Sequence, residues 1–113
     1  MYLKEHENGP SMVPPPSSAS GLYIRTRGGK LMKVSIPHDC LAFQTGEALQ
    51  LATGGKLQAT PHCVRVGSRD STISRETFAL FMNPNTNQLL TPSQSFGEFS
   101  KRVFGEHYDI TKQ

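Results

Sequence analysis

The sequence predicts a mainly β domain, a sheet sandwich or barrel, that ends in one helix. Short segments of β-forming residues follow one another between residues 22 and 82, separated by turns that contain Gly, Pro and Asn. Towards the C-terminus the apolar residues change to a helical spacing. With 113 residues, of which 35% are hydrophobic, the chain is long enough for one small domain with a modest core.

The N-terminal residues 1–20 are predicted to be a Pro- and Ser-rich loop. Three consecutive prolines, Pro14 to Pro16, cannot join the interior of a sheet and favour extended polyproline geometry. Loops of this length are usually insertions or linkers between ordered elements. We therefore expect a folded segment before it.

Strands are predicted from Gly21 onwards. Residues 22–27 and 31–36 predict a hairpin, because Gly28-Gly29 supplies the positive φ angles of a tight turn. Glu47 to Ala52 is predicted as either a short strand or a helical turn. Three further strands are expected, at residues 40–45, at residues 57–66, where Pro61 interrupts the strand, and at residues 73–82, which are the most apolar. A polar loop is expected at residues 67–72.

Residues 85–113 are predicted to be a linker followed by an amphipathic helix. The helix could begin at Thr91-Pro92, with Pro in the first turn, or at Ser95, where Glu98 completes a capping-box pattern. Gly105 is expected to end it. The residues that share one face at helical spacing are Phe96, Phe99, Val103 and Phe104.

Composition excludes several classes of function. The net charge is only +3 and Lys and Arg are scattered, so no basic stripe predicts a nucleic-acid partner. No apolar run is long enough for a membrane span or a signal peptide, and a cytoplasmic protein is expected. Cys40 and Cys63 form no Cys-x-x-Cys motif and are expected to be reduced and mostly buried.

His62, Arg75 and Thr77 are the residues that could carry chemistry. The planar guanidinium of Arg75 matches a carboxylate bidentately. Thr77 lies two residues further along a predicted strand, so its hydroxyl would point to the same face and donate another hydrogen bond. A non-haem Fe(II) centre uses two His and one carboxylate, and His62 could be one of these ligands. Taken singly, each residue also fits an ordinary structural role.

Several segments, in the right order, resemble plant-type 2-oxoglutarate/Fe(II) dioxygenases, the isopenicillin N synthase-like family. The matching segments are residues 21–27 (the family's Gly-Leu-Gln-Val strand), 45–50 (Gly-Asp-x-Leu), 54–62 (Asn-Gly-x-x-x-Ser-x-x-His) and 75–81 (Arg-x-Ser and an apolar strand). The resemblance implies that residues 21–84 are the C-terminal half of a double-stranded β-helix, or jelly roll. It also implies that His62 is the distal iron ligand and that Arg75 and Thr77 bind the 2-oxoglutarate carboxylate. The parent protein would then oxidise a small organic substrate.

The family's His-x-Asp pair, which supplies the other two iron ligands, has one candidate here. In His6-Glu7-Asn8 the third position is a neutral amide, which cannot supply an anionic ligand. We therefore expect the pair to precede Met1 in a longer parent, with this chain an inactive fragment.

Two other readings stay open. A non-catalytic remnant could pair with another chain through exposed sheet edges, and an unrelated binding module would keep His62 and Arg75 apart. The other titratable residues are expected to have ordinary roles. His38 is expected in a turn exposed to solvent, Glu47 in a structural position, and His107 in a tail beyond the helix.

Overall fold

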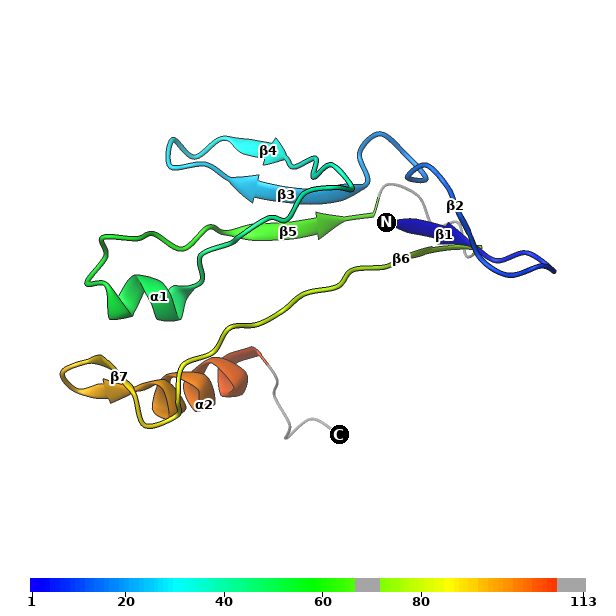
Figure 1. Cartoon of the computed structure of the whole chain (residues 1–113). Coiled ribbons are helices and arrows are strands. Elements are labelled where there is room, and N and C mark those ends of the chain that lie inside the picture. The colour runs from blue at the N-terminus through cyan, green and yellow to red at the C-terminus, as the bar shows by residue number, and fades with distance from the viewer. Residues whose placement is uncertain (67–71, 108–113) are drawn as a thin grey trace. The chain divides into compact units, whose positions relative to one another are not determined.

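The computed structural model describes residues 1–66 and 72–107, and the chain divides into two compact units (Figure 1). Unit 1 comprises Met1–Ala42 and Pro61–Leu80, and contains the strands β1 to β6. Unit 2 comprises Phe43–Thr60 and Phe81–Gln113, and contains both helices and a short hairpin. The chain is thus mainly antiparallel β with a C-terminal helix, as predicted, whereas the jelly roll stays a prediction.

The first sheet of unit 1 has the strand order β2-β1-β6 and is antiparallel. Its strands are β1 (Tyr2–Lys4), β2 (Ser11–Met12) and β6 (Ile73–Arg75). The prediction of a loop over residues 1–20 was therefore wrong in part. Strand β6 is the reason: it lies opposite β1, with Tyr2 facing Arg75, and supplies backbone partners from a distant part of the sequence.

The second sheet of unit 1 contains the predicted hairpin. Strands β3 (Gly21–Arg25) and β4 (Leu31–Lys33) are antiparallel, and Gly29 in their turn has a φ of 80°. Strand β5 (His62–Arg65) pairs with the other edge of β3. It begins directly after Pro61, which has no N–H to donate but accepts a hydrogen bond from the Arg25 N–H at 2.9 Å.

Among the described residues, one predicted strand is absent and another is shorter than predicted. Residues 40–45 form no strand, and β6 ends at Arg75, so that Thr77 lies beyond it. Neither segment has a neighbouring strand to pair with, and β-propensity alone does not make a strand. The predicted loop over residues 67–72 lies outside the described residues apart from Thr72.

Unit 2 is built from α1 (Glu47–Ala52), β7 (Leu89–Thr91), β8 (Gln94–Ser95) and α2 (Phe96–His107). Of the two alternatives for Glu47 to Ala52, the helix is confirmed. Of the two predicted starts for the C-terminal helix, Ser95 is confirmed, because Thr91-Pro92 instead lies where β7 turns towards β8. The helix continues past Gly105, so the predicted end was wrong.

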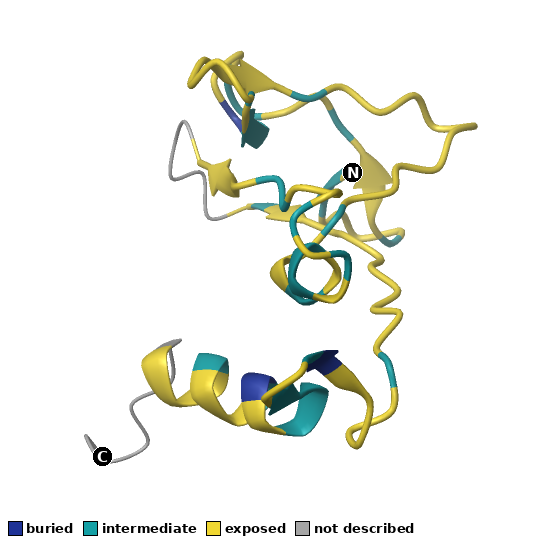
Figure 2. Ribbon diagram, turned by 90° about the vertical axis from the view of Figure 1, so that its left-hand side faces the viewer, coloured by how far each residue is buried: buried dark blue, intermediate teal, exposed yellow. Residues whose placement is uncertain are grey.

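The capping box fixes where α2 begins. The Ser95 hydroxyl accepts a hydrogen bond from the Glu98 N–H at 3.3 Å, and the Glu98 carboxylate accepts one from the Ser95 N–H at 2.7 Å. On the predicted apolar face, Phe99 is buried and Phe96 half-buried, with ring centroids 6.2 Å apart, whereas Phe104 is exposed. Leu90 on β7 is the other buried apolar residue among the described residues of unit 2. Figure 2 colours buried positions dark blue, including one on α2.

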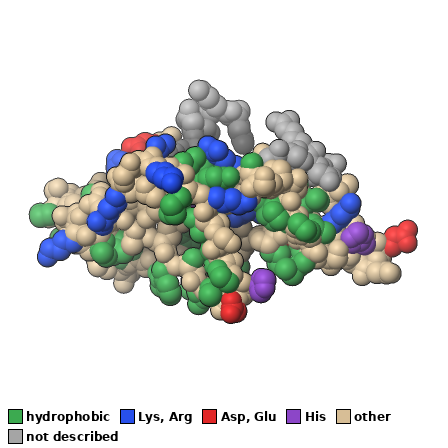
Figure 3. Space-filling view, turned by 90° about the horizontal axis from the view of Figure 1, so that it is seen from above, with side chains coloured by type: hydrophobic (Ala, Val, Ile, Leu, Met, Phe, Trp, Pro, Cys, Tyr) green, Lys and Arg blue, Asp and Glu red, His purple; other side chains and the backbone are tan. Residues whose placement is uncertain are grey.

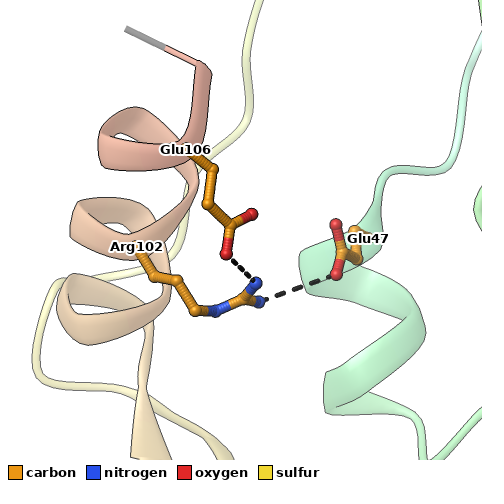
Figure 4. A network of polar contacts seen from close by, with 3 residues as sticks. All are labelled: Glu47, Arg102 and Glu106. Atoms are coloured by element: carbon orange, nitrogen blue, oxygen red, sulfur yellow. Dashed lines mark hydrogen bonds and ion pairs between the residues drawn. The ribbon is translucent and has the colours of Figure 1, made fainter. Parts of the chain in front are cut away.

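A polar network joins the two helices of unit 2 at the surface (Figure 4). Arg102 contacts Glu106, one turn further along α2, at 3.1 Å, and Glu47 of α1 at 3.7 Å. Its guanidinium also lies over the Phe99 ring, 5.5 Å from the centroid. Exposed ion pairs are worth little individually, so this network orients side chains more than it stabilises the unit. The structural role expected of Glu47 stays a prediction.

The surface carries apolar side chains among cations. Figure 3 shows hydrophobic side chains interleaved with Lys and Arg on the face that it draws, with no continuous basic stripe there. Both Cys40 and Cys63 are exposed, so the prediction of buried thiols was wrong. All four residues of β5, which include Cys63, are exposed because no described element covers that strand. No helix in the described residues is long and apolar enough to cross a membrane.

Candidate functional site

A cavity of about 670 Å³ in unit 1 contains two of the three predicted site residues. It lies where the chain leaves β6, and His38 and Cys40 line it from the sequence-distant segment that follows β4. Arg75 and Thr77 both line it. The residues that make its apolar walls are Met1, Met12, Ile36, Pro37 and Phe78.

The position of Arg75 follows from the first sheet. Arg75 is the last residue of β6 and lies opposite Tyr2. The next residue, Glu76, makes two backbone hydrogen bonds to Met1. The Glu76 N–H donates to the Met1 carbonyl at 2.9 Å, and the Met1 amino group donates to the Glu76 carbonyl at 3.2 Å. Thr77 is the residue after Glu76, and it is exposed. A cation and a hydroxyl two residues apart are thus presented to one cavity.

His38 and Cys40 line the same cavity, which the sequence did not indicate. His38 lies in a turn, as predicted, and the Cys40 N–H donates to the Pro37 carbonyl at 3.1 Å, which closes that turn. The Cys40 thiol lies 3.6 Å from the Asp39 carboxylate. No local pattern marks these residues, because the cavity forms from segments that are far apart in the sequence.

His62 lies elsewhere in unit 1. It opens β5 opposite Ile24, in the second sheet, and is exposed. It is not among the described residues that line the cavity of Arg75 and Thr77. Because neighbouring residues on a strand face opposite sides, Cys63 cannot act together with it.

The residues that the structure describes do not fit a complete iron centre. Among them, no three His, Cys, Asp or Glu side chains lie close enough to hold a metal ion. His6 lies beside the turn between β1 and β2 and is exposed, and its i+2 neighbour Asn8 carries no charge. His107 is the last residue of α2 rather than a tail beyond it. One imidazole, such as that of His62, cannot hold Fe(II) by itself.

The cavity does fit one end of a dicarboxylate. Arg75 offers a planar pair of donors and Thr77 a hydroxyl, which together match the lone pairs of one carboxylate. His38 is a further polar group on the wall, whereas the Glu76 carboxylate, which also lines the cavity, would repel a bound carboxylate. The apolar walls suit the methylene part of a short dicarboxylic acid.

Comparisons with known proteins agree with this chemistry at a coarse level. Over 94 residues, 83% of its length, the chain is 31% identical to a 2-oxoglutarate-dependent ethylene/succinate-forming enzyme of Ralstonia nicotianae. The match covers 26% of that enzyme, so the chain spans about a quarter of its relative. No family model matches the chain, and no solved structure matches it significantly. The sequence is therefore similar to part of one 2-oxoglutarate-dependent enzyme.

Proposed function

We propose that this chain is the part of an Fe(II)- and 2-oxoglutarate-dependent dioxygenase that binds the distal carboxylate of 2-oxoglutarate. By itself it binds the co-substrate without oxidising anything. The complete enzyme would act on a small organic substrate. The relationship to a 2-oxoglutarate-dependent enzyme supports the class of co-substrate.

One observation carries the proposal: Arg75 and Thr77, which are adjacent to the end of β6, line one cavity. Free Arg and Thr side chains are common on surfaces, but here both meet a space with apolar walls. The cavity is open to solvent, with Phe78 94% exposed, so the binding strength would come from the charge-assisted hydrogen bonds that Arg75 and Thr77 make together to one carboxylate. The net contribution of one such hydrogen bond is about 1.5–3 kcal/mol.

Iron belongs to the proposal only for the complete enzyme. We propose His62 as one of its ligands there, with two further ligands from outside the described residues. When bound, the metal would supply the oxidation chemistry. The residues of this chain would hold the co-substrate carboxylate.

The test is a titration of 2-oxoglutarate into the chain in the presence of a chelator, followed by NMR or calorimetry. Under these conditions only carboxylate recognition is measured. We expect Arg75→Ala to weaken binding about 10- to 100-fold, since about 1.4 kcal/mol is a factor of ten. Thr77→Val, which removes the hydroxyl and keeps the shape, should weaken it less.

The matched control is Arg27→Ala. Arg27 is an exposed arginine in the β3–β4 turn, in the same unit but outside the cavity. Removing it changes the net charge equally and should leave the affinity unchanged. If both variants weakened binding equally, the affinity for 2-oxoglutarate would depend only on the overall charge of the chain, and the proposal would fail.

A non-catalytic role is the second candidate, favoured by the unpaired, exposed backbone that follows β6. A remnant of this kind would bind no 2-oxoglutarate in the same titration. The two candidates therefore separate in one experiment.

A further inference from the structure

Glu76 places a carboxylate in the wall of the cavity that contains Arg75 and Thr77. The three residues are consecutive, so one short stretch of chain presents a cation, an anion and a hydroxyl to the same space in unit 1. Two carboxylates that share a site repel each other. The position of Glu76 is therefore unfavourable for a ligand with two carboxylates, and favourable for one that carries a cation.

The charges of Arg75 and Glu76 are not used up by contacts within the chain. Among the described residues, the ion pairs are those of Arg102 with Glu47 and Glu106, and neither Arg75 nor Glu76 takes part in one. Both side chains are exposed. Each charged group is thus available to a ligand in the cavity.

Glu76 is the one acidic residue among the described residues that line the cavity. The other polar side chains of the wall, His38 and Cys40, carry no negative charge in their ordinary neutral forms. Met1 also lines the cavity, but its amino group donates to the backbone carbonyl of Glu76, at 3.2 Å. An ammonium group on a ligand would therefore have the Glu76 carboxylate as its partner, and a second ligand carboxylate would be repelled by it.

We propose that Glu76 determines the specificity of this site, by favouring a carboxylate ligand that also carries an ammonium group over one that carries a second carboxylate. Short amino acids form this class of ligand. The inference rests on the proposed function, because it takes the recognition of one carboxylate by Arg75 and Thr77 as given. It follows that Glu76 lowers the affinity of the chain for 2-oxoglutarate, which is a dicarboxylate.

Three ligands of equal length test the proposal, because they differ only in the group at one end. Valerate ends in a methyl group, γ-aminobutyrate in an ammonium group and glutarate in a second carboxylate. An exposed charge pair changes an affinity by about two- to fivefold, and Glu76→Gln removes both the attraction and the repulsion. We therefore expect the affinity for γ-aminobutyrate, divided by that for glutarate, to fall roughly 4- to 25-fold in Glu76→Gln.

The measurement is an NMR titration of the isotope-labelled full chain with each ligand, in the presence of a chelator. Valerate should bind the natural sequence and Glu76→Gln alike, because its far end is uncharged. Glu76→Gln keeps the two backbone hydrogen bonds to Met1 and nearly the shape of the side chain, so the variant should fold.

The matched control is Glu7→Gln. Glu7 is an exposed acid in the same unit, in the turn between β1 and β2, and it lies outside the cavity. Its removal changes the net charge equally and should leave the ratio of affinities unchanged. An unchanged ratio in Glu76→Gln, or an equal fall in both variants, would overturn the inference.

Arg75→Ala separates a failure of this inference from a failure of the proposed function. If Arg75→Ala weakens the binding of all three ligands while Glu76→Gln leaves the ratio unchanged, the carboxylate site stands and the specificity assigned to Glu76 does not. If none of the ligands binds the natural sequence, or if Arg75→Ala leaves their binding unaffected, the proposed function fails and the inference fails with it.

Discussion

Two tyrosines of unit 1 differ in what their hydroxyl groups contact. The Tyr2 hydroxyl is buried and has no hydrogen-bond partner among the described residues. The Tyr23 hydroxyl donates to the Ala19 carbonyl at 3.0 Å. A buried polar group without a partner loses its hydration and gains nothing in return.

We therefore expect Tyr2→Phe to raise the free energy of unfolding by about 1 kcal/mol, because the variant removes an unsatisfied hydroxyl and keeps the ring. Tyr23→Phe should lower it by about 0.5–1.5 kcal/mol, because it removes a hydrogen bond that is made. Urea denaturation of the two variants gives the comparison. A loss of stability in Tyr2→Phe would show that its hydroxyl has a partner in solution.

Single residues of the candidate site were predictable to different degrees. Arg75 and Thr77 could be selected from the sequence because their chemistry and spacing suit a carboxylate. The reason given, alternation along one strand, does not hold at Thr77, which lies beyond β6. His38 could not be selected, because its place on the cavity wall depends on how residues 36–40 lie against the end of β6.

The first turn of α2 contains a titratable cap. Hydrogen bonds from the backbone N–H and hydroxyl of Ser95 lower the pKa of the Glu98 carboxyl below its ordinary value of 4.5, and Lys101 acts in the same direction. Because the pKa is lower in the folded chain, the cap's contribution is present above pH 4.5 and is lost as the pH falls through the folded value.

We expect the helical signal of α2 to weaken as the pH is lowered below about 4.5, the ordinary value of the carboxyl. Glu98→Gln should remove this part of the pH dependence, since Gln can also complete a capping box. Ser95→Ala should cost about 1 kcal/mol at neutral pH. Circular dichroism at 222 nm against pH measures all three proteins. An unchanged acid profile in Glu98→Gln would assign the titration to another carboxylate.

Elements set by neighbouring residues were predictable, and those that need distant partners were not. The start of α2 at Ser95 and the β3–β4 hairpin depend on a cap and a Gly-Gly turn, both local. Strand β1 depends on β6, more than sixty residues further along, and was expected to be loop. Residues 40–45 have strand-forming side chains but form no strand among the described residues, so their intrinsic preference is not realised.

The chain as a whole buries few apolar side chains. Among the described residues, the buried ones are Leu90 and Phe99, both in unit 2, and Ser20 in unit 1. Hydrophobic burial is the dominant favourable term in folding, so the stability of the isolated chain should be low.

The isolated chain should therefore unfold at a low concentration of urea. Ordinary domains have a free energy of unfolding of about 0.05–0.15 kcal/mol per residue. We expect this chain to lie at or below the lower end of that range, because Leu90 and Phe99 are the buried apolar residues among those that the structure describes. Urea denaturation followed by circular dichroism measures this value. A free energy of unfolding in the middle of the range would contradict the expectation, since it would require apolar burial that the described residues do not have.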